Sequence, residues 1–360
     1  MKILGIETSC DETAAAVVED GRRVLENVVY TQIPLHVPYG GVVPEIASRA
    51  HVEKISEVIR TALGAHRVDA VAVTYGPGLS PALIVGLNAA KGLAKALHVP
   101  LAGINHIEAH LHTPFLYDAA EGAPAGVPEP HDACPALGLA ISGGHTAWID
   151  MPEYGRYEIV GQTLDDAAGE AFDKAAKLLE LGYPGGPKVD RLAKAWRETH
   201  SDGEMISFPK GRPREGVSAL SGLPAELCVS FSGLKTALLR YVQLHGGAAE
   251  LAAAGEIERV VASYQEAIVQ AVADRTRHAL RRRAYRALVL GGGVSLNSRL
   301  RAVMAGVAAE AGVPLLTAKP KFCGDNGAMI AGLAYCRRNL LGEAAMRLDA
   351  NPCLEAGQEP

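Results

Sequence analysis

The sequence repeats one pattern of strands and turns, once in each half of the chain. Residues 2–30 contain an apolar strand, a polar turn over residues 7–13 and a returning strand. Residues 136–160 contain the same order, with a glycine turn at residues 142–146 between two apolar runs. A strand, a tight turn and a returning strand are typical of a hairpin. Two copies in one chain predict two domains of similar fold.

A second shared unit follows each hairpin. The apolar run 70–73 leads into the glycine turn 76–78 and then into a helix, and the run 287–290 leads likewise into the turn 291–293 and a helix. Short apolar runs rich in β-branched residues suit strands that are buried on both faces. We therefore predict an α/β protein of two mixed sheets flanked by helices, with glycine turns from both halves converging on a cleft.

An acidic stretch with prolines and glycines at residues 116–135 marks the expected domain boundary, because its composition is that of a surface loop. We assign residues 1–132 to the first domain and residues 133–325 to the second. A last helix over about residues 326–345 is expected to pack back on the first domain. A chain of 360 residues is long enough for two cores.

Composition narrows the classes of function. The formal net charge of −5 gives no overall basic field, so contact with a nucleic acid must use local patches or a partner. The 6 cysteines form no C-x-x-C pair and no secretory signal is evident, which favours a reduced, cytoplasmic setting. Asn88, Lys91 and Lys95 interrupt the apolar stretch 82–97, so no membrane span is predicted.

The pentapeptide at residues 106–110 is the strongest candidate site. His106 and His110 are four residues apart, so in a helix they share one face and both imidazoles can reach one metal ion. Glu108 points about 200° round the helix from His106. A protease of the H-E-x-x-H type needs its glutamate directly after the first histidine. The spacing therefore favours a metal site and disfavours a peptidase.

A third metal ligand has to come from elsewhere, since two histidines leave the shell incomplete. Asp325 and Cys323 are both candidates, in a segment that opens the last helix. Asp325 also suits the N-cap position of that helix, which would give its carboxylate a structural role. The residues alone leave both roles open.

Several turns suit a nucleotide. Backbone N–H groups in the turns 142–146 and 291–295, together with the positive end of a following helix, are suited to phosphate oxygens. The G-x-x-x-x-G-K-[ST] motif is absent, so this is not a P-loop protein.

Acidic residues follow the second hairpin. Thr163 and Asp166 suggest a helix N-cap, and Asp166, Glu170 and Asp173 then recur on one helical face. A solvated face is one interpretation. The other uses Asp173 to accept hydrogen bonds from ribose hydroxyls, with Asp190 as a second carboxylate nearby.

Two basic segments, residues 210–214 and 275–286, allow two interpretations. The longer one is typical of a solvated helix face. Together they could also contact the phosphates of an RNA. Aromatic residues make up only 5% of the chain, so stacking platforms for single strands are not evident.

Eight motifs occur in one order along the chain, at residues 7–13 (ETSCDET), 39–45 (YGGVVPE), 106–110 (HIEAH), 142–146 (SGGHT), 169–174 (GEAFDK), 231–235 (FSGLK), 291–297 (GGGVSLN) and 325–326 (DN). Together they closely resemble the bacterial TsaD branch of the tRNA N6-adenosine threonylcarbamoyltransferase family. The resemblance covers roughly residues 3–335. Departures from the family pattern are Gly324 in place of a common threonine, the pair Ser80-Pro81, and a longer loop at residues 116–135.

The resemblance implies a fold of two actin/hexokinase/Hsp70-like (ASKHA) domains facing a nucleotide cleft. It implies transfer of the threonylcarbamoyl group from threonylcarbamoyl-AMP to N6 of adenosine 37 in tRNAs that read codons beginning with A, with release of AMP. One divalent metal per subunit is expected, Fe²⁺ or Zn²⁺, with ATP or ADP as further occupants of the cleft. The expected partners are tRNA, an inactive TsaB-like paralogue, a TsaE-like ATPase and a TsaC-like synthase that supplies threonylcarbamoyl-AMP.

Matching motif positions also imply site residues. The implied metal ligands are His106, His110 and Asp325. The implied adenylate-binding residues are Ala140, Ile141, Ser142, Gly143, Gly144, Asp173, Gly186, Asp190 and Asn297. A base that accepts the proton of the adenosine amine is also needed. Asp11 and Glu12, in the first hairpin turn, are the candidates.

Three rival functions predict different observations. The paired histidines suggest a metal-dependent endopeptidase, which the position of Glu108 disfavours. An ATP-dependent small-molecule kinase of the same fold would stay active after chelation of a tightly bound transition metal. An ATP-switched scaffold would bind its partners in a nucleotide-dependent way and would leave the mass of tRNA unchanged.

Overall fold

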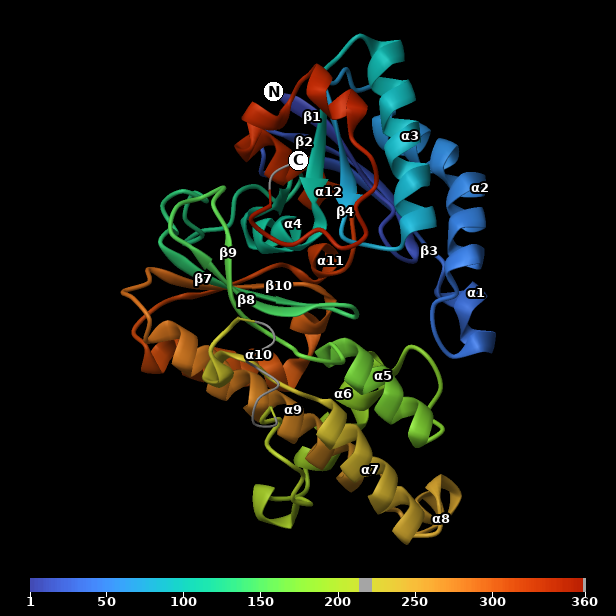
Figure 1. The fold of residues 1–360 in the computed structure, drawn as a ribbon, viewed down its shortest axis with the longest axis vertical. Helices are drawn as coiled ribbons and strands as arrows, with labels where there is room; N and C mark the ends of the chain where they lie inside the picture. Colours follow the sequence, from blue (N-terminus) through green and yellow to red (C-terminus); the bar gives the residue numbers. More distant parts are fainter. Residues whose placement is uncertain (214–221, 359–360) are drawn as a thin grey trace.

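The computed structural model describes residues 1–213 and 222–358, and two mixed sheets form its framework (Figure 1). The first sheet has the strand order β5-β4-β1-β2-β3-β6. β1, β2 and β3 are antiparallel, and β4 and β5 extend the sheet from β1 in parallel. Its strands are β1 (Lys2–Glu7), β2 (Glu12–Glu19), β3 (Arg23–Thr31), β4 (Ala70–Gly76), β5 (Leu101–Asn105) and β6 (Tyr117–Asp118).

The second sheet repeats this plan in the order β11-β10-β7-β8-β9. β7, β8 and β9 are antiparallel, and β10 and β11 extend the sheet from β7 in parallel. Five strands therefore match in order and direction between the halves, which confirms the predicted duplication. The strands are β7 (Ala136–Ile141), β8 (Thr146–Met151), β9 (Glu158–Gln162), β10 (Ala287–Gly291) and β11 (Leu315–Thr317).

Helices cover both faces of the first sheet. α2 and α3 pack on its outer face, whereas α4 and α12 lie between the two sheets (Figure 1). α4 contacts β5 of the first sheet and β7 and β10 of the second, so both halves hold it in place. The bounds are α1 (Ile33–His36), α2 (Pro44–Leu63), α3 (Ser80–Leu97), α4 (His106–His112), α11 (Pro320–Cys323) and α12 (Gly327–Cys336).

The remaining helices lie beyond the second sheet, on its side away from α4 (Figure 1). α9 is the central helix of this layer and packs against α6, α10 and β7. The bounds are α5 (Ala168–Leu178), α6 (Gly185–Arg197), α7 (Ser232–Leu244), α8 (Ala248–Ala253), α9 (Ile257–Leu280) and α10 (Ser298–Glu310).

One apolar cluster joins the inner faces of the two sheets around α4. It includes Ile3 and Ile104 from the first sheet, Ile149 and Val289 from the second, and Leu111 of α4. All five side chains are buried. Because α4 is surrounded by this core, its polar side chains are also buried and need partners inside the protein.

Two helix predictions need correction. The helix predicted from the Thr163–Asp166 pattern begins only at Ala168, because the Thr163 hydroxyl donates to the Asp166 carbonyl and closes a turn before it. The last helix, predicted over residues 326–345, ends at Cys336. Two short 3₁₀ turns follow it. The chain leaves the helix where Arg337 turns its guanidinium into the core.

The apolar stretch 82–97 belongs to α3, which carries three polar interruptions. Across the residues that the structure describes, none of the helices combines the length and apolar character needed to cross a membrane. All six cysteines are free, as their scattered positions predicted.

Candidate metal centre and nucleotide cleft

α4 begins directly where β5 ends. The Asn105 side chain caps the helix by accepting hydrogen bonds from the backbone N–H groups of Ile107 (2.9 Å) and Glu108 (3.2 Å). A strand that runs straight into a capped helix fixes the direction of the first turn. This places His106 and His110 on the side of α4 that faces the cleft between the sheets.

His106, His110 and Asp325 meet at one point. The Nε2 atoms of the two histidines are 3.1 Å apart, and Oδ1 of Asp325 lies 3.2 Å from Nε2 of His110 and 3.7 Å from Nε2 of His106. Among the described residues these three form the group of side chains that could hold a metal ion. Asp325 comes from the segment just before α12, more than 200 residues after α4.

The N-cap role considered for Asp325 is wrong. Asn326 caps α12 by accepting a hydrogen bond from Met329 N (3.1 Å), which leaves the Asp325 carboxylate free to face the histidines. Cys323, the other ligand candidate, is turned toward the backbone carbonyls of Ala318 and Lys319. Of the two residues that the sequence left open, only Asp325 reaches the imidazoles.

Glu7 is a partner of the site that the sequence analysis missed. It ends β1, is fully buried, and its Oε2 lies 3.1 Å from Nδ1 of His106. Thr74 donates to the same oxygen (2.5 Å) and the backbone of Ser9 donates to Oε1 (2.5 Å). A carboxylate bonded to one ring nitrogen fixes the tautomer and leaves the other nitrogen for a metal. The sequence feature that could have identified Glu7 is a carboxylate at the end of an apolar, buried strand.

The triad fits a divalent metal. Two nitrogens bound about 2.1 Å from one ion are roughly 3.0–3.4 Å apart at bond angles near 90–109°, which matches the observed separation. Nδ1 of His110 is buried and has no hydrogen-bond partner among the described residues. Two imidazoles and a carboxylate are a donor set that zinc and ferrous iron both accept.

Local charges alter the proton affinities of the triad. Burial alone would lower the pKa of His106, but the carboxylates of Glu7 and Asp325 outweigh it and raise that pKa to about 9. Burial and the neighbouring His106 lower the pKa of His110. Burial would raise the pKa of Asp325, yet the histidines hold it well below its usual range. The carboxylates of Glu7, which is buried, and Asp325, which is half-buried, thus favour a cation at this point, either a proton or a metal ion.

A cavity of about 500 Å³ opens beside the triad. The first half of the chain contributes the segment from Ser9 to Glu12 and the segment from Pro77 to Leu79. The second half contributes the glycine turn after β7, Gly293 and the pair Tyr183-Pro184. The predicted convergence of turns from both halves on one cleft is therefore present.

Asp11 and Glu12, the two candidates for the base in the first hairpin turn, both line this cavity. Burial, with the nearby carboxylates of Asp11 and Asp325, raises the pKa of Glu12 to about 10. A raised pKa favours the protonated form of a carboxyl group, which donates a hydrogen bond rather than accepting a proton.

The glycine turns differ in what their glycines do. Ser142, Gly143 and Gly144 line the cavity, and a Cβ on either glycine would meet no atom within 4 Å, so their backbone faces open space. A Cβ on Gly291 would lie 2.2 Å from the carbonyl oxygen of His110, so only glycine lets β10 approach α4 this closely. Burial lowers the pKa of His145, in the first turn, to about 4.

Six of the nine residues expected at the nucleotide lie outside the lining of this cavity, and four of them hold helix ends together, namely Asp173, Gly186, Asp190 and Asn297. Asp173 accepts hydrogen bonds from the backbone of Gly185 (2.7 Å) and Gly186 (3.3 Å) at the start of α6. Asp190 accepts from Ser298 N and from the Gln265 amide. Asn297 caps α10. Ala140 and Ile141 are buried residues at the end of β7.

Glu108 faces away from the metal site, as the helical spacing predicted. Its carboxylate pairs with Arg337 (3.2 Å) and accepts a hydrogen bond from Gly357 N (2.9 Å). The peptidase alternative would need this glutamate on the metal face. The structure therefore gives Glu108 a structural role.

One arginine of the longer basic segment departs from the solvated-face interpretation, whereas Arg281, Arg282, Arg283 and Arg286 are exposed. Arg275, expected on a solvated helix face, is buried and donates to the carbonyls of Cys228 (2.9 Å) and Gly211 (3.3 Å). Arg212 is exposed and lines a separate hollow of about 510 Å³ together with Arg240. Arg214, the last residue of the shorter basic segment, lies outside the described residues.

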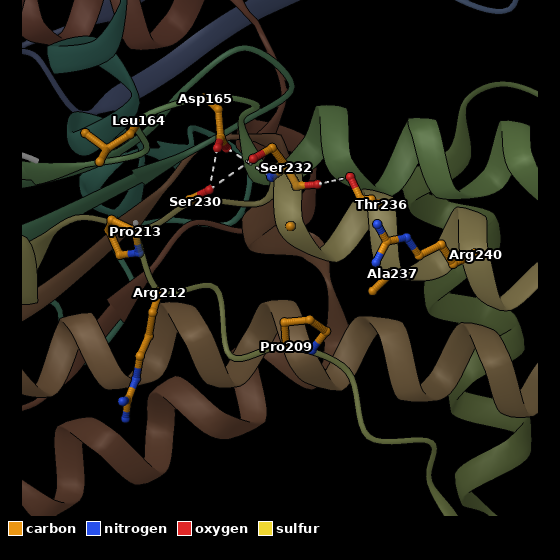
Figure 2. A pocket seen from close by; sticks show the side chains of 11 residues that line it. Leu164, Asp165, Pro209, Arg212, Pro213, Ser230, Ser232, Thr236, Ala237 and Arg240 are labelled. Carbon is orange, nitrogen blue, oxygen red and sulfur yellow. Dashed lines mark hydrogen bonds between the residues drawn. The ribbon is translucent and has the colours of Figure 1, made fainter. Parts of the chain in front are cut away.

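Figure 2 shows that the hollow beside α7 already contains a carboxylate. Asp165 accepts hydrogen bonds from the Ser230 hydroxyl (2.5 Å) and from the backbone of Phe231 (2.7 Å) and Ser232 (3.3 Å). The positive end of α7 is thus neutralised by the protein's own anion. Despite its two arginines, this hollow is a poor site for a phosphate group.

Comparisons with known proteins agree with this architecture. A family model described as "TsaD: tRNA N6-adenosine threonylcarbamoyltransferase" matches residues 23–332. The tRNA N6-adenosine threonylcarbamoyltransferase of Anaeromyxobacter sp. (strain Fw109-5) is 49% identical over 98% of this chain and 99% of that protein. The protein with the same description from Clostridium perfringens (strain 13 / Type A) is 44% identical, over 99% of this chain and 98% of that protein.

Two solved structures share the fold at low sequence identity. Full-length HypF in its phosphate- and nucleotide-bound form has a TM-score of 0.55 at 13% identity, over 95% of this chain and 47% of that chain. Component A of the (R)-2-hydroxyglutaryl-CoA dehydratase of Acidaminococcus fermentans has a TM-score of 0.50 at 15% identity, over 94% and 99%. These likenesses support the predicted fold class, two similar ASKHA domains.

Proposed function

The chain belongs to the tRNA N6-adenosine threonylcarbamoyltransferase family, and on that premise we propose how its central cavity carries out the reaction. The enzyme transfers the threonylcarbamoyl group of threonylcarbamoyl-AMP to N6 of adenosine 37 in tRNAs that read codons beginning with A, and it releases AMP. One observation supports placing this reaction in the cavity: His106 and Asp325, two members of the triad with His110, line the same hollow as the glycine turn after β7.

We propose that the triad holds one divalent ion, Fe²⁺ or Zn²⁺. Bound there, the ion would act as a Lewis acid on the carbonyl of the transferred group. Glu7 keeps the His106 ring oriented with Nε2 toward Asp325, which prepares the site for its ion. The buried core around α4 keeps both imidazoles in position and excludes water from their other faces.

The second half of the chain would bind the adenylate. Gly143 and Gly144 of the turn after β7 line the cavity, and their backbone N–H groups would donate to the phosphate as AMP departs. This turn directly follows β7. The first residues of α6 and α10, which belong to the same half of the chain, are held by Asp173 and Asp190. We assign the adenylate, or ATP or ADP in the same cleft, to Ala140, Ile141, Ser142, Gly143, Gly144, Asp173, Gly186, Asp190 and Asn297.

Transfer needs one proton acceptor. The adenosine N6 forms a bond to the carbamoyl carbon, the bond from that carbon to the phosphate oxygen breaks, and AMP leaves with the electron pair. The proton lost by N6 would pass to Asp11, which lines the cavity. Glu12 would serve as a hydrogen-bond donor in the same wall, because burial and the neighbouring Asp11 carboxylate raise its pKa and favour its protonated form.

The remaining assignments are proposals of the same kind. We place the domain boundary at residues 132–133, after the last strand of the first sheet and before β7. The family membership supports a TsaB-like paralogue and a TsaE-like ATPase as protein partners, and a TsaC-like synthase as the source of the adenylate. A tRNA substrate supports a cytoplasmic location.

Nucleoside mass spectrometry tests the function directly. The protein, with and without the partner proteins, is incubated with unmodified tRNA and threonylcarbamoyl-AMP. The tRNA is then digested, and the masses of its nucleosides are measured. We expect adenosine to gain the mass of one threonylcarbamoyl group at position 37, and a tRNA with guanosine at that position to gain none. Peptide cleavage, phosphate transfer or an unchanged tRNA mass in every combination would overturn the proposal.

A further inference from the structure

The carboxyl-terminal segment 348–357 returns to the first sheet after the last 3₁₀ turn. The backbone N–H of Asn351 donates to the carbonyl of Tyr75 (2.7 Å), and that of Gly78 donates to the carbonyl of Pro352 (3.3 Å). A Cβ on Gly76 would lie 2.0 Å from the Asn351 carbonyl oxygen. The end of β4 therefore accommodates this segment closely, and only because residue 76 is glycine.

The same segment is held by the helix that carries the metal ligands. Asn105 Nδ2 donates to the carbonyl of Glu355 (2.9 Å), and Gly357 N donates to Glu108 (2.9 Å). Within the segment, the side chains of Leu354 and Ala356 are only 3% and 7% exposed. A segment with buried side chains and bonds at both ends is part of the folded body rather than a loose tail.

Pro352 brings this segment to the reaction site, because its side chain lines the 500 Å³ cavity. The first half of the chain adds three apolar side chains to the cavity, from Ile33, Pro77 and Leu79. Pro352 lies next to Gly78 and so continues this wall. Apolar walls of this kind suit the faces of a nucleobase taken out of its stack.

The two halves of the cavity differ in chemistry. The open glycine turn, suited to phosphate, comes from the second half. The adenylate would occupy the side of the cavity formed by the second half of the chain. The amine of the acceptor nucleoside must therefore approach the carbamoyl carbonyl along the side formed by the first half. We propose that segment 348–357, anchored by Asn105 and Glu108, completes the wall that receives the acceptor nucleoside of the RNA. This inference rests on the proposed function and adds the subsite for its second substrate.

Steady-state kinetics on the full chain with its partners tests the wall. Pro352→Ala removes its apolar surface and keeps the backbone bonds. Asn105→Asp keeps a side-chain oxygen that can cap α4 and removes the N–H that donates to the Glu355 carbonyl. We expect each variant to raise the KM for tRNA about tenfold, with the KM for threonylcarbamoyl-AMP and the bound metal unchanged within about twofold. Gln358→Ala is the matched control, since its side chain bonds to Glu355 at the exposed end of the segment.

The outcomes separate this inference from the proposed function. If the wild-type protein transfers nothing to tRNA, the proposed function fails. If the wild type is active but both variants keep the wild-type KM for tRNA, the wall does not receive the acceptor. An equal rise in both KM values would also overturn the inference, because it would show general loosening of the site.

Discussion

The two faces of α4 carry similar residues with opposite roles. His106 and His110 lie on one face, and Glu108 and His112 lie on the other. All four are almost completely buried, at 4%, 2%, 3% and 0% exposure. Burial therefore does not separate the functional face from the structural one. What separates them is whether their polar atoms already have partners.

On the structural face the polar atoms are satisfied by the protein. Glu108 pairs with Arg337 and Gly357, and His112 bonds to Tyr154 and to the carbonyl of Gly21. On the other face, the Nε2 atoms of two imidazoles point at each other and at a carboxylate, and Nδ1 of His110 has no partner among the described residues. Two ring nitrogens that face each other and a carboxylate have no good mutual hydrogen-bond geometry, and a metal ion bound between the two Nε2 atoms and Oδ1 of Asp325 would satisfy these three atoms.

Replacing a ligand on the functional face should have the largest effect. His110→Ala removes one of three donors, so we expect loss of the tightly bound metal and transfer activity lower by about a thousandfold. Metal analysis of the purified protein and single-turnover transfer to tRNA measure the two effects. A variant that keeps both full activity and wild-type metal content would remove the distinction between the two faces.

Breaking the ion pair on the structural face should reduce stability instead. Arg337→Ala removes the guanidinium that faces Glu108, so the free energy of unfolding should fall by about 3–5 kcal/mol. Urea denaturation measures this loss. The double variant Arg337→Ala with Glu108→Gln should recover part of it, because the buried charge is then also gone. No recovery in the double variant would show that the ion pair is not the cause.

Local periodicity was enough to predict α4 and the pairing of its histidines. The spacing of His106 and His110 places them on one face, and the same argument correctly placed Glu108 on the other. The duplicated strand pattern likewise predicted two sheets of one topology. These features are local or repetitive, so they are visible in a single sequence.

Partners that are distant in the chain were not visible. Glu7 is 99 residues from His106 and Arg337 is 229 residues from Glu108, so no spacing argument could pair them. The choice between Asp325 and Asn326 as the cap of α12 depended on which side chain turns toward the helix, since either type can cap. The assignment of the segment 348–357 to the cavity also needed the tertiary structure.

Glu7 offers a finer test of the functional face. Glu7→Gln keeps the shape and an acceptor but loses the charge that orients His106, so metal affinity should fall about 10–100-fold. Competition with a chromophoric chelator, using Zn²⁺ as the probe, measures the affinity. Glu108→Gln is the matched control, because it changes an equally buried carboxylate on the other face of α4 and should alter the affinity less than about twofold. Equal losses in both variants would mean that the charge at Glu7 has no special role.

The smallest expected effect concerns an ion network outside the lining of the cavity, which should behave as the structural face of α4 does. Glu266 pairs with Arg197 (3.1 Å) and Arg299 (2.7 Å). Burial would raise the pKa of Glu266, but these arginines and Gln270 lower it. A lowered folded-state pKa stabilises the protein above the unfolded value near 4.3, and this contribution is lost as pH falls through the folded pKa.

We therefore expect Glu266 to contribute stability at pH 7 that disappears progressively as the pH falls below the unfolded value near 4.3. Denaturation at a series of pH values, for the wild type and Glu266→Gln, isolates it. The difference in unfolding free energy between the two proteins should shrink as the pH falls, whereas transfer activity at pH 7 should stay close to wild type. A difference that is constant with pH would mean that the carboxylate contributes through packing alone. Loss of bound metal in Glu266→Gln would instead show that closed ion pairs and the open triad are energetically coupled, and that the two kinds of buried charge are not independent.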